Sequence, residues 1–213
     1  MKIACLQFNP IQENTYVVWD DTSEAVVIDA GNSNPREDAA LDNFIAQHGL
    51  KPVLAVNTHG HFDHTLGVAH LKKRYGIPFA LSSKDQFLLD NASTSGSIFG
   101  VAVGEMPAAD IDLDTTPEIR FGHTVLRVIH TPGHTPGGVT LKVGDVLLTG
   151  DTLFQGSMGR TDFEGGSYAE IMASLGRLGR LSGDYHVLPG HMGASTLEQE
   201  RKTNYYLREA MEG

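Results

Sequence analysis

The sequence predicts an α/β protein with its sheets in the middle and its helices on the outside. Two observations lead to this fold class. The first strand-like segments follow one another with no helix between them, and strands then alternate with helices in both halves of the chain. In α/β folds, ligands bind where strands end in loops. Residues directly after strands are therefore the first places to look for a site.

The first half of the chain has clear element boundaries. Apolar runs at Tyr16–Trp19 and Ala25–Ile28 predict two strands of a meander. A helix is expected next, because Pro35 suits a first helical position and Gly49 suits a helix end. The run "VLAV" before "NTHG" is typical of a buried strand. After it, Leu66–Tyr75 predicts a second helix that ends at Gly76.

The second half repeats this alternation. Capping-box patterns start two late helices, one at Ser167 with Glu170 and one at Ser195 with Glu198. Asn91 to Thr116 shows little periodicity and is expected to form a long loop or insertion. No repeat or linker divides the chain, so residues 1–213 are expected to form one domain. The other expected strands are Phe79–Leu81, Ile119–Phe121, Val125–Ile129, Val139–Val143, Val146–Thr149 and His186–Leu188.

Composition excludes several classes of function. A net charge of -10 argues against nucleic acid and anionic membrane as partners, because both need a basic face. The single cysteine, Cys5, cannot form an internal disulfide. No apolar run reaches the roughly 18 residues of a membrane helix, and the N-terminal segment lacks a signal-peptide core. We therefore expect a cytoplasmic protein.

The segment "VNTHGHFDHTLG" concentrates metal-type ligands in one place: His59, His61, Asp63 and His64. On a helix, His59 and His61 would point about 200° apart, so they can share an ion only from a loop or extended segment. Their position after a strand provides that segment. Imidazole and carboxylate together suit zinc, iron or manganese, and no thiolate lies nearby to suggest a structural cysteine site. An open, catalytic metal site is the expected kind.

Three further segments repeat the order of strand, tight turn and ligand. "HTPGHTPGG" contributes His134, "LLTGDTLF" contributes Asp151 and "VLPGHMG" contributes His191. Each is weak alone, because an Asp after "TG" is most often a turn or cap residue. Together with the first cluster they make five His and two Asp, enough for two ions with one Asp bridging.

"THGHFDH", "TPGHTPG", "TGDTLF" and "PGH", in this order, resemble the metallo-β-lactamase superfamily and most closely its glyoxalase II-like (hydroxyacylglutathione hydrolase-like) branch. The resemblance implies an αβ/βα four-layer sandwich with two mixed sheets flanked by helices. It implies two divalent ions, with zinc expected first and iron or manganese as alternatives. By position, the first ion would be held by His59, His61 and His134, the second by Asp63, His64 and His191, and both by the bridging Asp151.

The resemblance also implies a metal-dependent hydrolase. A metal-bridging hydroxide would attack the thioester carbonyl of a substrate such as S-D-lactoylglutathione. Asp151 and Asp63 are the candidate catalytic residues, and Asp63 could serve as a ligand, fix the hydroxide or accept a proton. A small-molecule thioester is thus the expected partner, with glutathione recognition left open. The sequence makes no prediction of oligomeric state.

Substrate recognition is where the chain departs from full-length glyoxalase II, which carries a further helical domain. Only 22 residues follow His191, so the chain resembles the compact bacterial type. Arg160 matches a basic residue that contacts a glutathione carboxylate in the family, although a structural ion pair is an equal alternative. The C-terminal "ERKTNYYLREAM" offers further cations, but a solvated amphipathic helix explains most of them.

Two other functions remain open. "GRTDF", Gly159 to Phe163, also resembles persulfide dioxygenases of the same superfamily, which are oxidoreductases with one iron on two His and one Asp. Against it stands "GDTLF", which is closer to the glyoxalase II run. A non-catalytic metal-binding module is disfavoured because every expected ligand is present.

Overall fold

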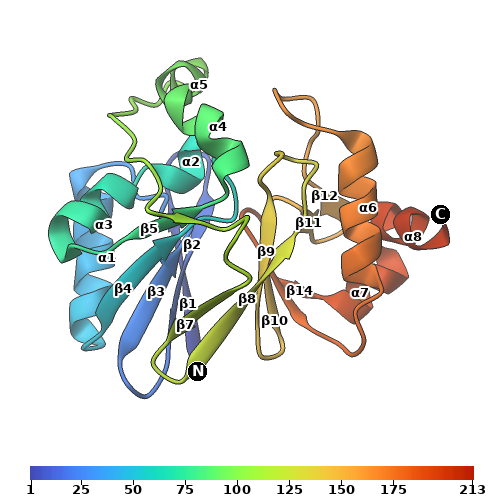
Figure 1. The fold of residues 1–213 in the computed structure, drawn as a ribbon, viewed down its shortest axis with the longest axis horizontal. Helices are drawn as coiled ribbons and strands as arrows, with labels where there is room; N and C mark the ends of the chain where they lie inside the picture. The colour runs from blue at the N-terminus through green and yellow to red at the C-terminus, as the bar shows by residue number, and fades with distance from the viewer.

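The computed structural model describes residues 1–213 as two six-stranded sheets packed face to face, with helices on both outer faces (Figure 1). The strand order is β1-β2-β3-β4-β5-β6 in the first sheet and β14-β13-β10-β9-β8-β7 in the second. Both sheets mix parallel and antiparallel pairs, for example β3 with β4 and β2 with β3. The expected α/β class and the four-layer sandwich are confirmed.

The first half of the chain builds the first sheet and its helical layer. The sheet contains β1 (Lys2–Phe8), β2 (Glu13–Trp19), β3 (Glu24–Ile28), β4 (Lys51–Val56), β5 (Phe79–Leu81) and β6 (Ile111–Asp112). Its helices are α1 (Pro35–Gln47), α2 (Phe62–Thr65), α3 (Val68–Tyr75), the 3₁₀ turn η1 (Ser83–Asp85), α4 (Gln86–Asp90) and α5 (Ala92–Ile98). Asn34 caps α1 by accepting from the backbone N–H groups of Arg36 and Glu37.

The second half builds the other sheet. Its strands are β7 (Glu118–Phe121), β8 (Thr124–His130), β9 (Val139–Val143), β10 (Val146–Gly150), β13 (His186–Pro189) and β14 (Ser195–Thr196). β11 (Leu153–Phe154) and β12 (Ser157–Met158) form a separate hairpin. The outer face carries α6 (Tyr168–Gly179), α7 (Leu197–Thr203) and α8 (Tyr205–Glu212).

Alternation of side chains along the strands sorts the core into layers. On β2, Tyr16 and Val18 join the core between the two sheets, whereas Val17 faces the core under the helices of the first half. On β10, Leu148 points between the sheets and Leu147 packs under the helices of the second half. A strand buried on both faces needs apolar residues at successive positions, which is why these strands read as continuous apolar runs.

Several boundaries differ from the sequence-based expectation. Lys2–Phe8 is a strand that the sequence interpretation did not include, and Phe8 is its only buried residue. The expected helix Leu66–Tyr75 is α3, which begins two residues later at Val68 and ends at Tyr75 as predicted. The short helix α2 before it was not expected. The segment Asn91 to Thr116 is not a plain loop, since it contains α5 and β6.

The two expected capping boxes had different outcomes. Ser167 accepts from the backbone N–H of Glu170, as predicted for the start of α6. For α7 the prediction was one residue early: Thr196, not Ser195, accepts from the backbone N–H of Gln199. Ser195 instead lies in β14, which pairs with β13 and so uses the backbone of Ser195 in a ladder.

The loops that follow β4, β8, β10 and β13 open at one end of the sandwich, the upper end in Figure 1. β10 and β13 are parallel, so both deliver their carboxyl ends to this edge. β4 lies in the other sheet and ends at the same level. No helix in the chain combines the length and the apolarity needed to cross a bilayer.

Candidate metal centre

The loop after β4 brings four of the predicted ligands together. His59 lies in a bend, and His61, in extended backbone, takes the N-cap position of α2. Asp63 and His64 follow in the first turn of that short helix. His59, Asp63 and His64 are all buried. The change from loop to helix inside six residues is what allows side chains with this spacing to converge.

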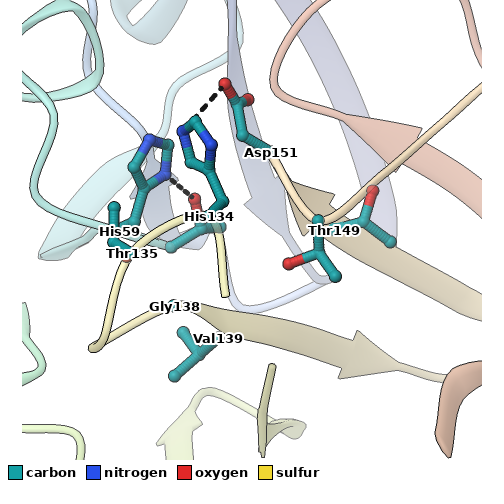
Figure 2. A pocket seen from close by; sticks show the side chains of 9 residues that line it. His59, His134, Thr135, Gly138, Val139, Thr149 and Asp151 are labelled. Carbon is teal, nitrogen blue, oxygen red and sulfur yellow. Dashed lines mark hydrogen bonds and ion pairs between the residues drawn. The ribbon is translucent and has the colours of Figure 1, made fainter. Parts of the chain in front are cut away.

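The remaining predicted ligands come from three other strand ends. His134 lies between β8 and β9, Asp151 directly follows β10, and His191 follows β13. His134 is buried and its neighbourhood includes His59 and Asp151 (Figure 2). All seven predicted ligand residues therefore meet at the end of the sandwich, between the two sheets.

Two of the three-residue groups of ligand atoms match the predicted ligand sets, and another joins Asp151 with His59 and His64. The first contains His59, His61 and His134, and the second contains Asp63, His64 and His191; within each group the atoms lie within 4.8 Å of one another. Asp151 lies near both groups. One of its oxygens is 3.5 Å from His134 Nε2, and the other is 3.5 Å from His64 Nε2.

Polar contacts on the far side of two rings orient the imidazoles of His134 and His64. His134 Nδ1 lies 2.7 Å from the carbonyl oxygen of Arg160, which can only accept, so Nδ1 carries the proton and Nε2 faces the site as a lone pair. His64 Nδ1 lies 3.2 Å from Asp29, which likewise leaves Nε2 for the site. Donation of the second ring nitrogen to a carbonyl or carboxylate is typical of metal-ligating histidines.

The site-facing atoms lack ordinary partners. His59 Nε2 and Asp151 Oδ1 are buried without a hydrogen bond. His61 Nδ1 lies 2.9 Å from His134 Nε2, and His64 Nε2 lies 3.2 Å from His191 Nε2. Two nitrogens bound to one tetrahedral ion at about 2.05 Å would be separated by about 3.3 Å. The donor set and its spacing thus fit two divalent ions.

The two groups differ in their affinity for protons. Burial and the neighbouring His134 lower the pKa of His61 to about 3, and burial with the adjacent imidazoles also holds the pKa of His59 well below its usual range. Burial opposes protonation of His64 as well, but the carboxylates of Asp63 and Asp151 raise its pKa well above the usual range. Despite burial, the pKa of His191 is raised, through its hydrogen bond to Asp63.

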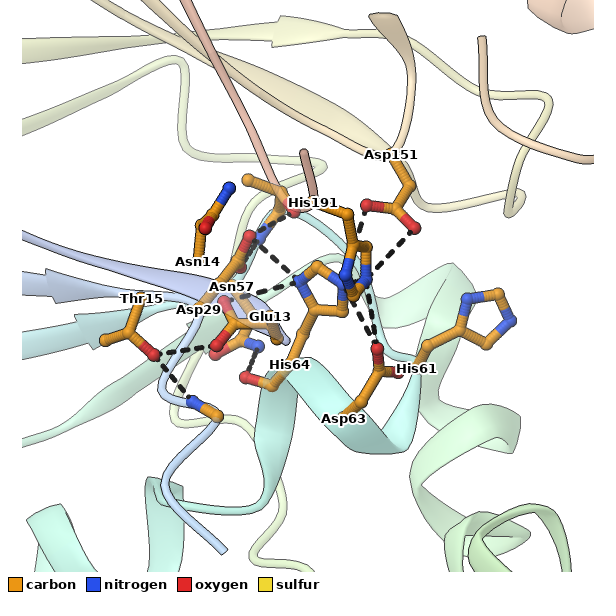
Figure 3. A network of polar contacts seen from close by, with 12 residues as sticks. Glu13, Asn14, Thr15, Asp29, Asn57, His61, Asp63, His64, Asp151 and His191 are labelled. Carbon is orange, nitrogen blue, oxygen red and sulfur yellow. Dashed lines mark hydrogen bonds and ion pairs between the residues drawn. The ribbon is translucent and has the colours of Figure 1, made fainter. Parts of the chain in front are cut away.

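A buried polar network supports His64 from behind (Figure 3). Asp29 accepts from the backbone N–H and the hydroxyl of Thr58, at 2.6 and 2.7 Å. Asn57 donates to the carbonyl oxygen of His64 at 2.6 Å. The sequence interpretation missed Asp29, although it directly follows β3 just as Asp151 directly follows β10. An Asp directly after a buried strand was the sequence signal that could have identified Asp29.

Arg160 lies beside the first group but is already paired. Its Nε and Nη2 donate to the two oxygens of Asp162, both at 2.6 Å, and its guanidinium lies 4.1 Å from the ring centroid of Phe163. The Phe163 ring is in turn 5.6 Å from the ring of His61. The structural ion pair that the sequence allowed is therefore present, and Nη1 remains without a hydrogen bond in the protein.

The C-terminal cations face away from the metal groups. All three guanidinium nitrogens of Arg201 donate to backbone carbonyls, those of Gly179, Leu181 and Gly183. Lys202 pairs with Glu198 within α7, and Tyr206 packs against the core under α6. These side chains hold the last helices in place. The expected single helix is two, since Asn204 ends α7 and caps α8. The expectation that most of these side chains are solvated holds, because Lys202, Tyr205 and Arg208 are exposed.

Comparison with known proteins agrees with this geometry. The family profile described as the metallo-beta-lactamase superfamily matches residues 8–191. Hydroxyacylglutathione hydrolase GloC from Haemophilus influenzae is 32% identical over 212 residues, which cover 97% of this chain and 98% of that protein. The two chains match over nearly their whole lengths, as the expected resemblance to compact members of the family requires.

Solved structures extend the comparison. The crystal structure of BLEG-1 B3 metallo-beta-lactamase is 33% identical with a TM-score of 0.89, covering 97% of this chain and 99% of that one. TTHA1623 in a di-iron-bound form is 33% identical with a TM-score of 0.85, covering 95% and 99%. ETHE1 from Myxococcus xanthus is 26% identical with a TM-score of 0.79, covering 96% and 84%. With its fold, its ordered ligand motifs and these relatives, the chain belongs to the metallo-β-lactamase superfamily.

Proposed function

We propose that this protein is a binuclear metallohydrolase that cleaves thioesters such as S-D-lactoylglutathione. The observation that carries the proposal is the position of Asp151, whose two oxygens reach one imidazole of each ligand group. A carboxylate placed this way suits a bridge between two ions, and both three-residue groups are complete. Zinc is the expected metal. Iron is the alternative, because the similar protein TTHA1623 has a di-iron-bound form.

The proposed ligands are those that the sequence predicts. His59, His61 and His134 would hold the first ion, and Asp63, His64 and His191 the second, with Asp151 between them. Two bound ions would lower the pKa of a water molecule and polarise the substrate carbonyl. This chemistry needs no Ser, Cys or Lys nucleophile. The thiolate of a thioester leaves readily, so no general acid is required beside it.

Asp63 is suited to hold or accept a proton at this site. Burial acts against ionisation, but His64 and His191 keep the pKa of the Asp63 carboxyl below its usual range. Its Oδ2 lies 3.1 Å from His191 Nε2. The carboxylate is therefore ionised at neutral pH and can orient a water molecule through one oxygen while the other serves as a ligand.

Arg160 is the proposed contact for an anionic group of the substrate. Its backbone is tied to the site through His134, and its Nη1, which makes no hydrogen bond within the protein, is available to a ligand. The similarity to GloC, whose name specifies a hydroxyacylglutathione substrate, supports a thioester of glutathione. Because Asp162 neutralises Arg160, we expect glutathione recognition to be weak.

The decisive experiment is a substrate panel on protein whose metal content has been measured. S-D-lactoylglutathione, a neutral thioester, a β-lactam, an acyl-homoserine lactone and glutathione persulfide would each be assayed, with an oxygen electrode for the last. We expect about two ions per chain, thioester hydrolysis, no oxygen uptake and loss of turnover in Asp151→Ala. Hydrolysis of the β-lactam or lactone alone would refute the proposed substrate class without contradicting the proposed metal ligands.

A persulfide dioxygenase is the second candidate. The "GRTDF" pair of Arg160 and Asp162, together with the likeness to ETHE1, favours it. It needs one iron on two His and one Asp, and leaves the second group of ligands without a role. One iron per chain with persulfide-dependent oxygen consumption would establish it and refute the hydrolase.

A further inference from the structure

We infer that each ion is positioned by its own polar clamp: Asp85 holds the ligands of the first ion, and Asn14 with Tyr16 holds the His191 loop of the second. The inference rests on the two-ion site proposed above and is independent of its substrate. None of these three residues is a metal ligand. They are positioning residues that act through the backbone next to the ligands.

Asp85 joins the two segments that supply the first ion. It is fully buried at the end of η1 and accepts three hydrogen bonds. Its Oδ2 accepts from the backbone N–H of Gly60 at 2.9 Å and from the hydroxyl of Thr135 at 2.7 Å, and its Oδ1 accepts from the backbone N–H of Gly137 at 2.6 Å. Gly60 lies between His59 and His61, and Thr135 follows His134. One carboxylate thus ties together all three ligands of the first group.

The glycines around Asp85 allow this close approach. A Cβ on Gly60 would lie 2.9 Å from Asp85 Cβ, and one on Gly137 would lie 2.7 Å from Asp85 Cγ. Side chains at either position would force the carboxylate away from its donors. A carboxylate is also the side chain this place requires, since two oxygens accept from three donors. An amide of the same shape would offer one acceptor oxygen and turn its NH₂ toward an N–H group.

The second clamp comes from β2, in the opposite sheet to β13. Asn14 Nδ2 donates to the carbonyl oxygens of Pro189 and Met192, at 3.0 and 2.9 Å, and the Asn14 backbone N–H donates to Gly190 at 2.7 Å. The Tyr16 hydroxyl donates to Pro189 at 2.7 Å. These four bonds hold the backbone on both sides of His191. Met192 adopts φ 69°, an unfavourable conformation for a side-chain-bearing residue that the bond from Asn14 helps to hold.

The two clamps share no residue and act on different loops, so their effects should separate. Removing the outer hydrogen-bond partner of a metal ligand typically weakens metal binding about 10- to 100-fold. We therefore expect Asp85→Asn to raise the Kd of the first ion by about this factor and leave the second within about twofold. The double variant Asn14→Ala/Tyr16→Phe should raise the Kd of the second ion by about the same factor and leave the first within about twofold.

The test is calorimetric titration of metal-free protein with Zn²⁺, repeated with Co²⁺ to follow the ligand-field spectrum of each ion. The variants His134→Ala and His191→Ala assign each binding step to its group. Asp112→Asn is a matched control, because Asp112 accepts two backbone N–H groups, those of Ser83 and Asp114, without contacting either ligand loop. It should leave both Kd values unchanged.

Milder variants keep the inference testable if a clamp variant fails to fold. Thr135→Val removes one donor to Asp85 and should raise the Kd of the first ion alone by a few fold. Tyr16→Phe should raise the Kd of the second ion alone by a few fold. Equal changes at both ions in every clamp variant, or no change at either, would overturn the inference. A wild-type chain that binds one ion would overturn it together with the two-ion site, whereas separable metal effects without thioesterase activity would refute only the proposed substrate.

Discussion

Arg160 and Asp162 make the clearest test of specificity at the scale of single residues. The guanidinium of Arg160 lowers the pKa of Asp162 to about 2. Both side chains are therefore charged at neutral pH and are bound to each other. Asp162→Asn leaves Arg160 uncompensated beside the site. We expect kcat/KM for S-D-lactoylglutathione to rise about two- to fivefold, since exposed ion pairs are weak, while a neutral thioester is unaffected.

The matched control is Arg160→Gln, which should lower kcat/KM for the anionic thioester and leave the neutral one unchanged. Parallel changes for both substrates in either variant would show that Arg160 does not contact the charged part of the substrate. Steady-state kinetics on protein of equal metal content decides between these outcomes.

The pKa differences among the ligands predict the order in which acid removes the ions. A protonated imidazole cannot bind metal, and the pKa values of His64 and His191 are raised while that of His61 is about 3. As the pH falls, protons therefore occupy the second group first. Dialysis at stepwise lower pH should reduce the metal content from about two ions to one before the remaining ion leaves.

The ligand variants check this assignment. His191→Ala, which retains the first group, should keep its ion to a lower pH than His134→Ala, which retains the second. The reverse order, or simultaneous loss of both ions from the wild-type chain, would contradict it. Metal analysis by mass spectrometry after dialysis gives the answer directly.

At the scale of elements, Asn204 determines how the chain ends. It ends α7, caps α8 by accepting from the backbone N–H of Leu207, and donates to the carbonyl oxygens of Phe154 and Ser157 at 3.3 and 2.9 Å. A lost cap costs about 1 kcal/mol, and unsatisfied buried carbonyls add to that cost. Asn204→Ala should therefore lower the free energy of unfolding by about 2 kcal/mol.

Asn34→Ala provides the comparison, because Asn34 caps α1 with no role in another element. It should cost about 1 kcal/mol. Urea denaturation of the chelated protein measures both variants without a contribution from metal. Equal losses would mean that the contacts of Asn204 with the β11–β12 hairpin contribute nothing.

At the scale of the whole molecule, the ligands join the two halves of the chain. His59, His61, Asp63 and His64 come from the half that builds the first sheet, whereas His134, Asp151 and His191 come from the half that builds the second. Bound ions therefore stabilise the folded state by linking these halves. An ion at about 1,000 times its Kd contributes about 4 kcal/mol.

Chelation should accordingly lower the Tm by about 10 °C or more for a chain of this size. We also expect one calorimetric transition with and without metal, because the core between the sheets draws on both halves. Asp151→Ala should show a smaller shift on chelation. An unchanged Tm after complete metal removal, or two separate transitions, would contradict the prediction.

Most of the fold and all seven ligand candidates could be predicted from the sequence because their signals are local. A strand, a tight turn and a His or Asp lie within a few residues of one another, as in "LLTGDTLF" around Asp151. Edge strands such as β1 and β6, and the short helix α2, escaped prediction. Their apolar patterns are short, and pairing with neighbours determines their conformation.

The sequence by itself determined the superfamily, the layer order and the set of residues available as metal ligands. Only the tertiary structure decided which side chains hold those ligands in place and how Arg160 is used. Asp85 lies 25 residues from Gly60 and 50 from Thr135, and Asn14 lies 175 residues from Pro189. No local pattern records such contacts. They arise because the packing of the two sheets brings distant loops to one end, where buried N–H and C=O groups must find partners.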